Sequence, residues 1–238
     1  MKRFISIILI ISCAALLFSC SEKDDTVEKD LVIDTIDEIN TMYTAIAPTM
    51  VKTESTISFG EHVLTSTSTL KTGLVDGDKA SVYDYSRQEI RAIADGSGTD
   101  YVDPIVTVTG GWQYHEYDGY REIDEETGKF GDWDDTADDP TPAPGANVLN
   151  INKDNVSDFQ VDVENRIITF TVSVKNSEKV FGMEATSEVE VTITHSGADI
   201  TSVSLSFMGK VPDKKDYPEA AITVTANYSY EIQEISFD

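Results

Sequence analysis

The residues that could catalyse a reaction are few and scattered. The chain contains three histidines, His62, His115 and His195, and no two of them have the spacing of metal ligands. His115-Glu116 is not followed by the second histidine of a zinc-protease motif, and no nucleophile elbow is present. A solvent-facing side chain is therefore expected at each histidine. We expect no catalytic residue and no cofactor, which predicts that the protein is not an enzyme.

An acidic cluster is the group of side chains best able to hold a metal ion. Carboxylates are hard oxygen ligands, of which Ca²⁺ takes about six to eight. The spacing lacks the glycine and the closing glutamate of a calcium-binding EF-hand loop, and charge runs of this kind are usually solvated. We predict a solvated loop without a metal, and keep a calcium site as the alternative. The aspartates concerned are Asp132, Asp134, Asp135, Asp138 and Asp139.

Aromatic residues concentrate just before this acidic cluster. Cross-strand aromatic pairs contribute about 0.2–1 kcal/mol each, so packing between strands is the first explanation. Tyr and Trp also combine an apolar body with a polar tip, so the same residues could line the mouth of a ligand site. The cluster comprises Tyr101, Trp112, Tyr114, Tyr117, Tyr120, Phe130 and Trp133.

Residues 1–20 have the order of charge, apolar run and small residues of a secretory signal. Lys2 and Arg3 precede an uncharged run over 4–19, which is shorter than the roughly 20 residues of a membrane-spanning helix. The run ends Leu17-Phe18-Ser19-Cys20, which resembles the lipobox of bacterial lipoproteins. The resemblance implies cleavage before Cys20 and a diacylglycerol, with palmitate, on its thiol. An ordinary secretory signal with an incidental cysteine is the alternative.

The charge of the chain limits its partners. Its 238 residues include 43 acidic and 18 basic side chains, for a net charge of −25. Such a field repels nucleic acid and anionic lipid surfaces, so we expect attachment to a membrane through Cys20 alone and no nucleic-acid partner. The remaining partners are an apolar small molecule or lipid, and a protein that the sequence does not identify. We expect a tether at 21–25 and a single domain over 26–238.

An amphipathic helix is predicted from about Thr26 to Ala47, before Pro48. Apolar residues recur at steps of four and three, which puts them on one face, opposite aspartates. This face should pack on the core, and binding of a partner protein by this helix is the alternative. Its residues are Val32, Ile36, Ile39, Tyr43 and Ile46.

From Met50 onward the pattern alternates with period two, which predicts strands separated by turns such as Asp76-Gly77 and Asp118-Gly119. An acidic, proline-rich stretch at 134–145 should be a surface loop. The fold class is therefore mainly β, an antiparallel meander or half-barrel sheet with the N-terminal helix on its apolar face. The predicted strands are 51–59, 62–72, 79–86, 104–109, 111–117, 158–164, 166–174, 187–194, 200–208 and 221–232.

A helix followed by a long meander resembles the LolA and LppX-like envelope lipoproteins, and the alternating strand from Thr223 to Ile235 is similar to the ending of that family. The resemblance implies a curved sheet closed by helices over an apolar cavity. The cavity wall would combine the helix stripe with Val191, Ile193, Val203, Leu205, Val224 and Ala226, and its mouth would lie near Trp112 and Tyr114.

Two functions follow from these patterns. The first is a non-enzymatic, lipid-anchored protein of the cell envelope, in the outer membrane or at the cell surface of a diderm host, with an apolar or amphiphilic ligand between helix and sheet. The second is a surface interaction or adhesion module, or a subunit of a complex, with a solid core. The size of the internal space distinguishes them.

Overall fold

The computed structural model describes residues 48–60, 62–94, 99–101, 106–124, 126–141, 151–152, 154–181, 184–197, 199–210 and 219–237. Of residues 91–94, 99–101 and 106 it describes the backbone alone. The signal segment, Cys20 and the predicted helix over 26–47 lie outside these ranges. No helix within the described ranges has the length and apolar composition to cross a membrane.

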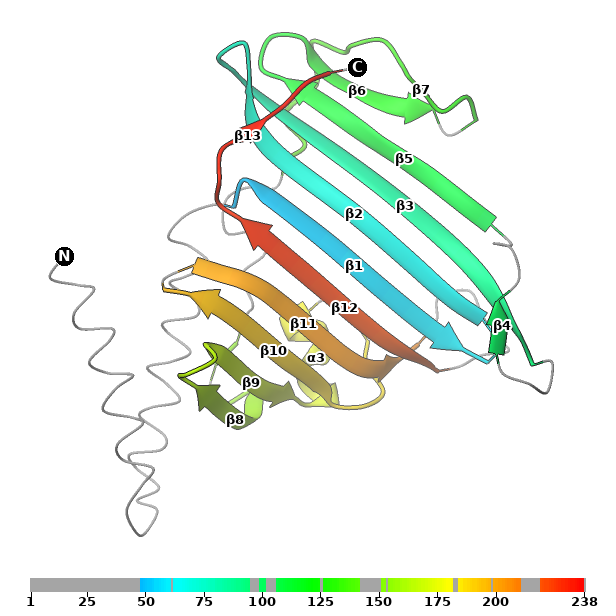
Figure 1. Ribbon diagram of the computed structural model, residues 1–238, viewed down its shortest axis with the longest axis vertical. Helices are drawn as coiled ribbons and strands as arrows, with labels where there is room; N and C mark the ends of the chain where they lie inside the picture. The colour runs from blue at the N-terminus through cyan, green and yellow to red at the C-terminus, as the bar shows by residue number, and fades with distance from the viewer. Residues whose placement is uncertain are drawn as a thin grey trace, which may run out of the picture.

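The described residues form one mainly antiparallel sheet of thirteen strands, drawn in Figure 1. Its order is β7-β6-β5-β3-β2-β1-β12-β11-β10-β9-β8, with β4 paired to β3 and β13 paired parallel to β2. Only one helix, α3 (Val174–Phe181), lies in the described part of the chain. The strands are β1 (Met50–Phe59), β2 (His62–Val75), β3 (Asp78–Ala94), β4 (Thr99–Tyr101), β5 (Val106–His115), β6 (Gly119–Asp124), β7 (Lys129–Phe130), β8 (Val156–Asp162), β9 (Ile167–Val172), β10 (Val189–Ser196), β11 (Asp199–Gly209), β12 (Ala220–Ser229) and β13 (Gln233–Glu234).

Two meanders make up the sheet. The first runs from β1 to β7 and the second from β8 to β12, and the acidic proline-rich segment connects them in sequence. Strands β1 and β12 pair over nine residues, from Met50 opposite Ser229 to Ser58 opposite Ala221. This pairing joins the two meanders at the centre of the sheet.

The turns form where the sequence allows a left-handed backbone. Asp76 and Gly77 have φ values of 52° and 99° between β2 and β3, and such a pair is the preferred two-residue hairpin turn. Gly119 and Gly197 also have positive φ, at the β5–β6 and β10–β11 turns. At Gly119 a side chain is excluded for a second reason, because a Cβ would lie 1.9 Å from the carbonyl oxygen of Asp134.

Alternate residues of each strand face opposite sides of the sheet. We call the side that carries α3 the inner face and the opposite side the outer face. Figure 1 draws α3 behind β9 and β10, so the inner face points away from the viewer there. The principal core lies between α3 and the inner face of β8–β11. Its buried residues are Ile151, Ile168, Phe170, Val172, Val180, Ala185, Val189, Val191, Ile193, Ile200, Val203 and Phe207.

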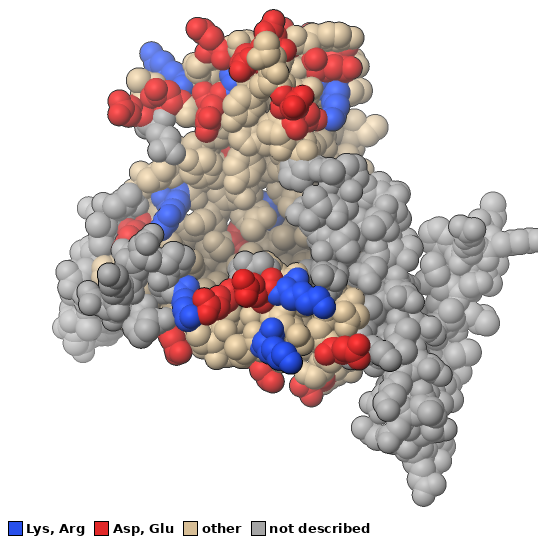
Figure 2. All heavy atoms as spheres, turned by 180° about the vertical axis from the view of Figure 1, so that it is seen from behind, with Lys and Arg blue, Asp and Glu red and all other residues tan. Residues whose placement is uncertain are grey.

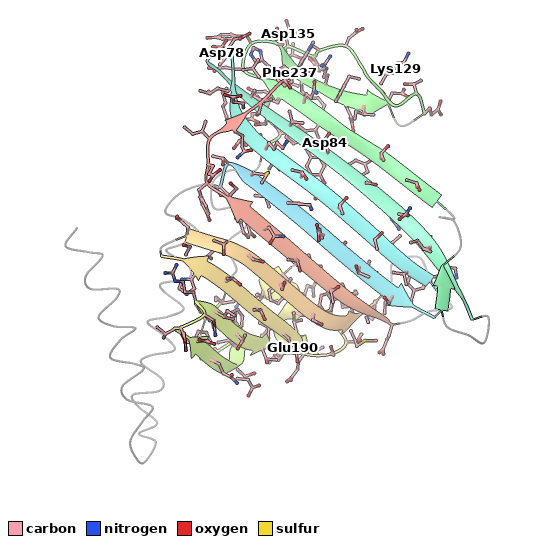
Figure 3. All side chains as sticks on the ribbon, in the orientation of Figure 1. Asp78, Asp84, Lys129, Asp135, Glu190 and Phe237 are labelled. Atoms are coloured by element: carbon pink, nitrogen blue, oxygen red, sulfur yellow. The ribbon has the colours of Figure 1, made fainter. Side chains whose placement is uncertain are left out.

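The C-terminal segment covers the outer face at the other end of the sheet. Strand β13 pairs with the part of β2 that extends beyond the first residue of β1: Gln233 and Glu234 lie opposite Gly73 and Leu74. Ile235 is buried there, and the Phe237 ring contacts His115 and Trp133 edge-on, with centroids 5.8 and 5.3 Å away. Figure 3 labels Phe237 beside β5 and β6, together with Asp84 and Glu190 of the outer face.

Most predicted strands are present, with shifted ends. The segments 104–109 and 111–117 are one strand in the structure, since β5 is continuous through Gly110 and Gly111. Strand β3 extends well beyond the predicted end at residue 86, and β12 ends at Ser229, before the predicted residue 232. Helix α3 and strands β4, β7 and β13 were not predicted.

Candidate functional site

From β10 to β5, the side chains of the inner face change from apolar to hydroxyl-bearing and then to aromatic. Its register defines three transverse rows, each formed by residues directly opposite one another on neighbouring strands. From β10 to β5 the first row is Ile193, Val203, Ala226, Thr53, Ser68, Tyr85 and Gly110. The second is Val191, Leu205, Val224, Ser55, Ser66, Arg87 and Val108. The third begins at β12 and runs Tyr228, Val51, Leu70, Tyr83 and Trp112.

The six residues predicted to line a cavity do lie on one face, at the apolar end of the first two rows. Val191, Ile193 and Val203 are buried in the core beneath α3, with Ile193 fully inaccessible. Leu205, Val224 and Ala226 are half-buried, nearer the middle of the sheet. The first three therefore belong to the packed core, Leu205 packs against its edge, and Val224 and Ala226 belong to neither core cluster.

The middle of the inner face is lined by short hydroxyl side chains. Thr53 and Ser55 on β1 lie opposite Ser68 and Ser66 on β2, and all four are half-buried. Figure 2 shows this side of the molecule hollowed between two lobes, which carry most of the charged side chains visible in this view. Short side chains at the centre leave room above the sheet that longer ones would fill.

An aromatic row occupies the far end of the inner face. Tyr83 on β3 lies opposite Trp112 on β5, with ring centroids 5.7 Å apart and planes inclined by 26°. Tyr85 follows Tyr83 at a centroid distance of 6.1 Å, and Tyr120 on β6 lies 6.1 Å from Trp112. All four side chains are half-buried. We call these four residues the aromatic row.

The predicted aromatic cluster is divided between the two faces. Trp112, Tyr114 and Tyr120 are on the inner face, as the register of β5 with β3 and β6 requires. Phe130 and Trp133 enclose the Arg121 guanidinium on the outer face, at 4.7 and 4.5 Å from the ring centroids. Tyr117 is exposed at the β5–β6 turn. Tyr101 is described in backbone alone, where it pairs with Ala92.

Arg121 also fixes this outer cluster to the sheet. Its Nε and Nη2 donate hydrogen bonds of 2.8 and 2.6 Å to Oε1 of Gln113, which is buried. The guanidinium thus has polar partners in its plane and aromatic rings on its faces, the arrangement that suits arginine. We assign this cluster to the attachment of the C-terminal segment, because Phe237 packs on Trp133.

Two of the acidic-loop carboxylates are occupied by contacts within the protein. Asp134 accepts hydrogen bonds from the Thr136 hydroxyl and amide, at 2.6 and 3.0 Å, which lower its pKa. Asp139 pairs with Lys79 and accepts a 2.9 Å hydrogen bond from the Thr141 amide. Burial alone would raise the pKa of Asp139, but these contacts outweigh it and the pKa is lowered. The hydrogen bond to Asp139 raises the pKa of Lys79.

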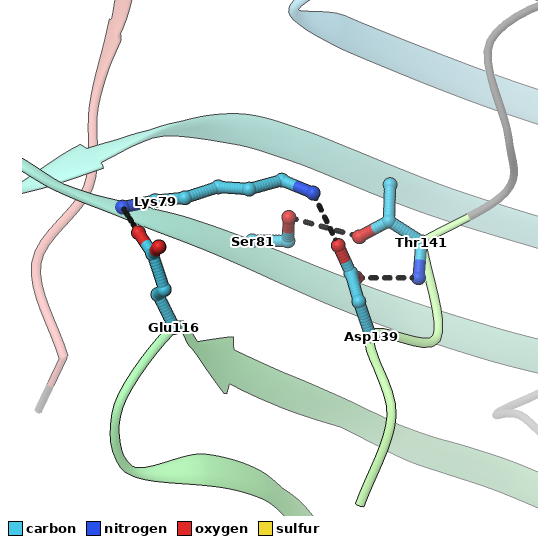
Figure 4. A network of polar contacts seen from close by, with 5 residues as sticks. All are labelled: Lys79, Ser81, Glu116, Asp139 and Thr141. Atoms are coloured by element: carbon cyan, nitrogen blue, oxygen red, sulfur yellow. Dashed lines mark hydrogen bonds and ion pairs between the residues drawn. The ribbon is translucent and has the colours of Figure 1, made fainter.

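Figure 4 shows how this network anchors the loop to β3. The Thr141 hydroxyl donates a 2.9 Å hydrogen bond to Oγ of Ser81, which is fully buried, and the Lys79 amide donates to Glu116 at 3.2 Å. Among the described residues, no three His, Cys, Asp or Glu side chains gather as metal ligands. Calcium binding by the loop stays a separate prediction, tested below.

Two histidines differ from the expected solvent-facing position. The His62 side chain retains 20% of its exposure and lies 3.1 Å from Glu89 on the inner face. The His115 side chain retains 12% and lies 2.8 Å from Asp118 on the outer face. The solvent-facing prediction is therefore wrong for both: the His62 ring stacks on Phe59 of β1, and the His115 ring contacts Tyr117 and Phe237. His195 is at a turn, as predicted, and its Nδ1 lies 3.3 Å from the Gly197 carbonyl.

Sequence reasoning missed half of the aromatic row. Tyr83 and Tyr85 were counted as ordinary residues of the predicted strand 79–86, although their spacing of two places both on one face. The helix stripe predicted to meet this face, from Val32 to Ile46, lies outside the described residues, as does Cys20.

Comparisons with known proteins give no family. No protein-family model and no curated protein matches the chain. Among solved structures, a DUF1329 family protein from Desulfovibrio piger aligns with 11% identity over 85% of this chain and 95% of its own, at a TM-score of 0.27. An outer membrane lipoprotein-sorting protein domain from Vibrio parahaemolyticus aligns with 9% identity, coverages of 84% and 91%, and a TM-score of 0.27.

A porin-like protein from Bacteroides uniformis aligns with 10% identity over 77% of this chain and 98% of its own, at a TM-score of 0.22. Scores this far below 0.5 assign neither a family nor a function to the chain. The function is therefore proposed from the inner face itself.

Proposed function

We propose that this chain is a non-enzymatic protein of the cell envelope, anchored by a lipid on Cys20, that binds an amphiphilic ligand on its inner face. The sequence supports the anchor through the lipobox-like residues 17–20. The observation that carries the binding function is the change from apolar to hydroxyl side chains along the inner-face rows. Leu205 and Val224 meet Ser55 and Ser66 in a single row, which suits a ligand with an apolar part and a polar part.

The inner face also offers a partner surface for the helix predicted over 26–47. Thr49, next to the start of β1, is fixed to the sheet by a 2.8 Å hydrogen bond from its amide to the Ser229 carbonyl. The outer face beside this point is occupied by β13 and Ile235. An apolar helix stripe arriving at Thr49 would therefore find its partner surface on the inner face, where Val224 and Ala226 are half-buried.

A fluorescent amphiphile tests the proposal. Dansyl-undecanoic acid should bind the full chain saturably, with a blue-shifted emission, because the dansyl group enters apolar surroundings. Val224→Asp should weaken binding about tenfold, since a carboxylate facing the apolar part of the ligand is costly to desolvate. The matched control is Thr223→Asp, one residue away on the exposed outer face, which should bind like the wild type.

Absence of saturable binding, or equal weakening by Val224→Asp and Thr223→Asp, would refute an amphiphile site on the inner face. A second readout is native mass spectrometry of the protein purified from its own host. A noncovalent amphiphile that dissociates on denaturation would support the proposal, and the covalent lipid on Cys20 would remain.

One observation favours the alternative, a surface interaction module with a solid core. Val191, Ile193 and Val203 were expected to wall a cavity, and they are buried together with Val180 of α3. That half of the molecule is packed like a core, without a role in ligand binding. The two functions then differ only in the middle of the inner face, where Val224 lies.

A further inference from the structure

The aromatic row has no part in the proposed amphiphile site. Tyr83, Tyr85, Trp112 and Tyr120 come from three strands and form an unbroken series of ring contacts, with centroids 5.7–6.1 Å apart. None of the four belongs to either hydrophobic core cluster of the described residues. The row therefore presents aromatic surface at the rim of the hollow, on the side away from α3.

Polar groups that suit hydroxylated ligands surround the row. Ser68 lies directly opposite Tyr85, and Ser66 lies opposite Arg87, on the same face. Glu122 is directly opposite Trp112. Arg87 and Glu122 are both exposed. A sugar ring has an apolar C–H face and an edge of hydroxyl groups. Aromatic rings suit the face, and the hydroxyl, guanidinium and carboxylate groups beside them can hydrogen-bond to the edge.

The backbone is shaped to hold one of these rings against the sheet. A Cβ on Gly110 would lie 2.5 Å from Cζ and Oη of Tyr85, so the ring lies against the bare backbone of β5. Glycine within a strand often marks such a close approach. The consequence is that the Tyr85 ring is held in place beside Ser68.

We propose that the aromatic row and its polar neighbours bind neutral sugar rings of a glycan. The charge of the protein selects the class of glycan. A net charge of −25 repels acidic polysaccharides over distances comparable with the screening length. The inference does not depend on the amphiphile site, because the aromatic residues lie on β3, β5 and β6 and the apolar residues of the amphiphile site lie on β11 and β12; only the hydroxyl side chain of Ser66 borders both.

The test uses the two tryptophans of the chain, which lie on opposite faces. Trp133→Phe leaves Trp112 as the single reporter on the inner face, and Trp112→Phe leaves Trp133 on the outer face. The full chain is purified in lauryldimethylamine oxide, since detergents with sugar head groups would compete. The probes are maltohexaose, cellohexaose and chitohexaose, with hexagalacturonate as the anionic control.

At least one neutral hexasaccharide should shift the fluorescence of the Trp133→Phe protein saturably, at concentrations up to roughly 10 mM. The outer-face reporter in Trp112→Phe should not respond. By calorimetry Tyr83→Ala should weaken binding about tenfold and Tyr83→Phe should preserve it, because the ring supplies the contact. Hexagalacturonate should bind about tenfold more weakly than the neutral sugar, and that difference should shrink at high salt.

Failure of all three neutral sugars to shift Trp112, or binding that Tyr83→Ala leaves intact, would overturn the proposal. Circular dichroism of Tyr83→Ala establishes that the variant is folded, and Tyr85→Ala provides a second variant on the same row. Val224→Asp separates the two sites: it should weaken dansyl-undecanoic acid binding about tenfold and leave sugar binding unchanged. Loss of both ligands in this variant would refute the independence of the sites.

Discussion

The contrast between the packed and the hollow parts of the inner face leads to a quantitative prediction on β10 and β12. Ile193 is fully buried in the cluster that includes Val180 of α3. Ala226 belongs to the same transverse row, two strands away, and is half-buried. Enlarging a side chain should therefore be costly at the β10 end of the face and tolerated at the β12 end.

The expected magnitudes follow from burial. Ile193→Ala removes buried methyl groups and leaves a cavity, at a cost of about 2–5 kcal/mol. In a domain of this size each kcal/mol lowers Tm by about 2–4 °C, so a cost of about 3 kcal/mol lowers it by about 6–12 °C. Val191→Phe should cost about 1–3 kcal/mol by overpacking. Ala226→Phe should cost less than about 0.5 kcal/mol if the space above it is open.

Thermal and urea unfolding of the full chain, followed by circular dichroism, measure these differences. Glu190→Ala is the matched control on β10, because Glu190 is exposed on the outer face. It should shift the free energy of unfolding by less than about 0.5 kcal/mol.

Two results would refute this division of the inner face. A cost below about 1 kcal/mol for Ile193→Ala would mean that the α3 core is not tightly packed. Equal destabilisation by Val191→Phe and Ala226→Phe would mean that the middle of the face is filled as densely as the core. The second result would favour the interaction module over the amphiphile-binding protein.

Three further predictions concern the anchor, the acidic loop and Tyr230, which follows β12. Labelled palmitate should enter the wild type and not Cys20→Ala; equal labelling would exclude the anchor. Ca²⁺ should raise Tm no more than Mg²⁺ does at equal ionic strength, and a calcium-specific rise lost in Asp134→Asn would establish a metal site. Burial raises the pKa of Tyr230 to about 12, and its hydroxyl donates a 3.0 Å hydrogen bond to the Ile200 carbonyl. The unfolded chain therefore loses this proton first, near pH 10, and stability should fall as pH rises from about 10 to 12. Tyr230→Phe should show a smaller alkaline loss in urea titrations, and an unchanged loss would contradict this cause.

The strands and hairpins could be predicted because they depend on local patterns. Val189, Val191 and Ile193 alternate with exposed or half-buried residues along β10, and the burial in the structure follows this alternation. Asp76-Gly77 specifies a two-residue turn through its positive φ values, independently of the rest of the fold. Alternation and turn residues together determined which side chains share a face.

Helix α3 could not be predicted from these patterns. Only Ser177 and Val180 of its eight residues are buried, which is too few for a helical period to emerge. The preceding residues also alternate like a strand, from Phe170 to Val174. The helix depends on contacts outside itself: Val180 packs in the core of the sheet, and Ser177 accepts a 3.2 Å hydrogen bond from the Ala185 amide.

The candidate sugar site shows how a pairing register can create a surface that no single segment displays. Gly110 falls between two predicted strands, 104–109 and 111–117, yet β5 continues through it. The physical reason for Gly110 lies in the neighbouring strand, because Tyr85 on β3 occupies the space that a Cβ on Gly110 would need. A glycine inside a strand indicates a close approach even when the approaching group is unknown. Only the pairing of β3 with β5 identifies that group as the ring of Tyr85 and aligns Tyr83 with Trp112.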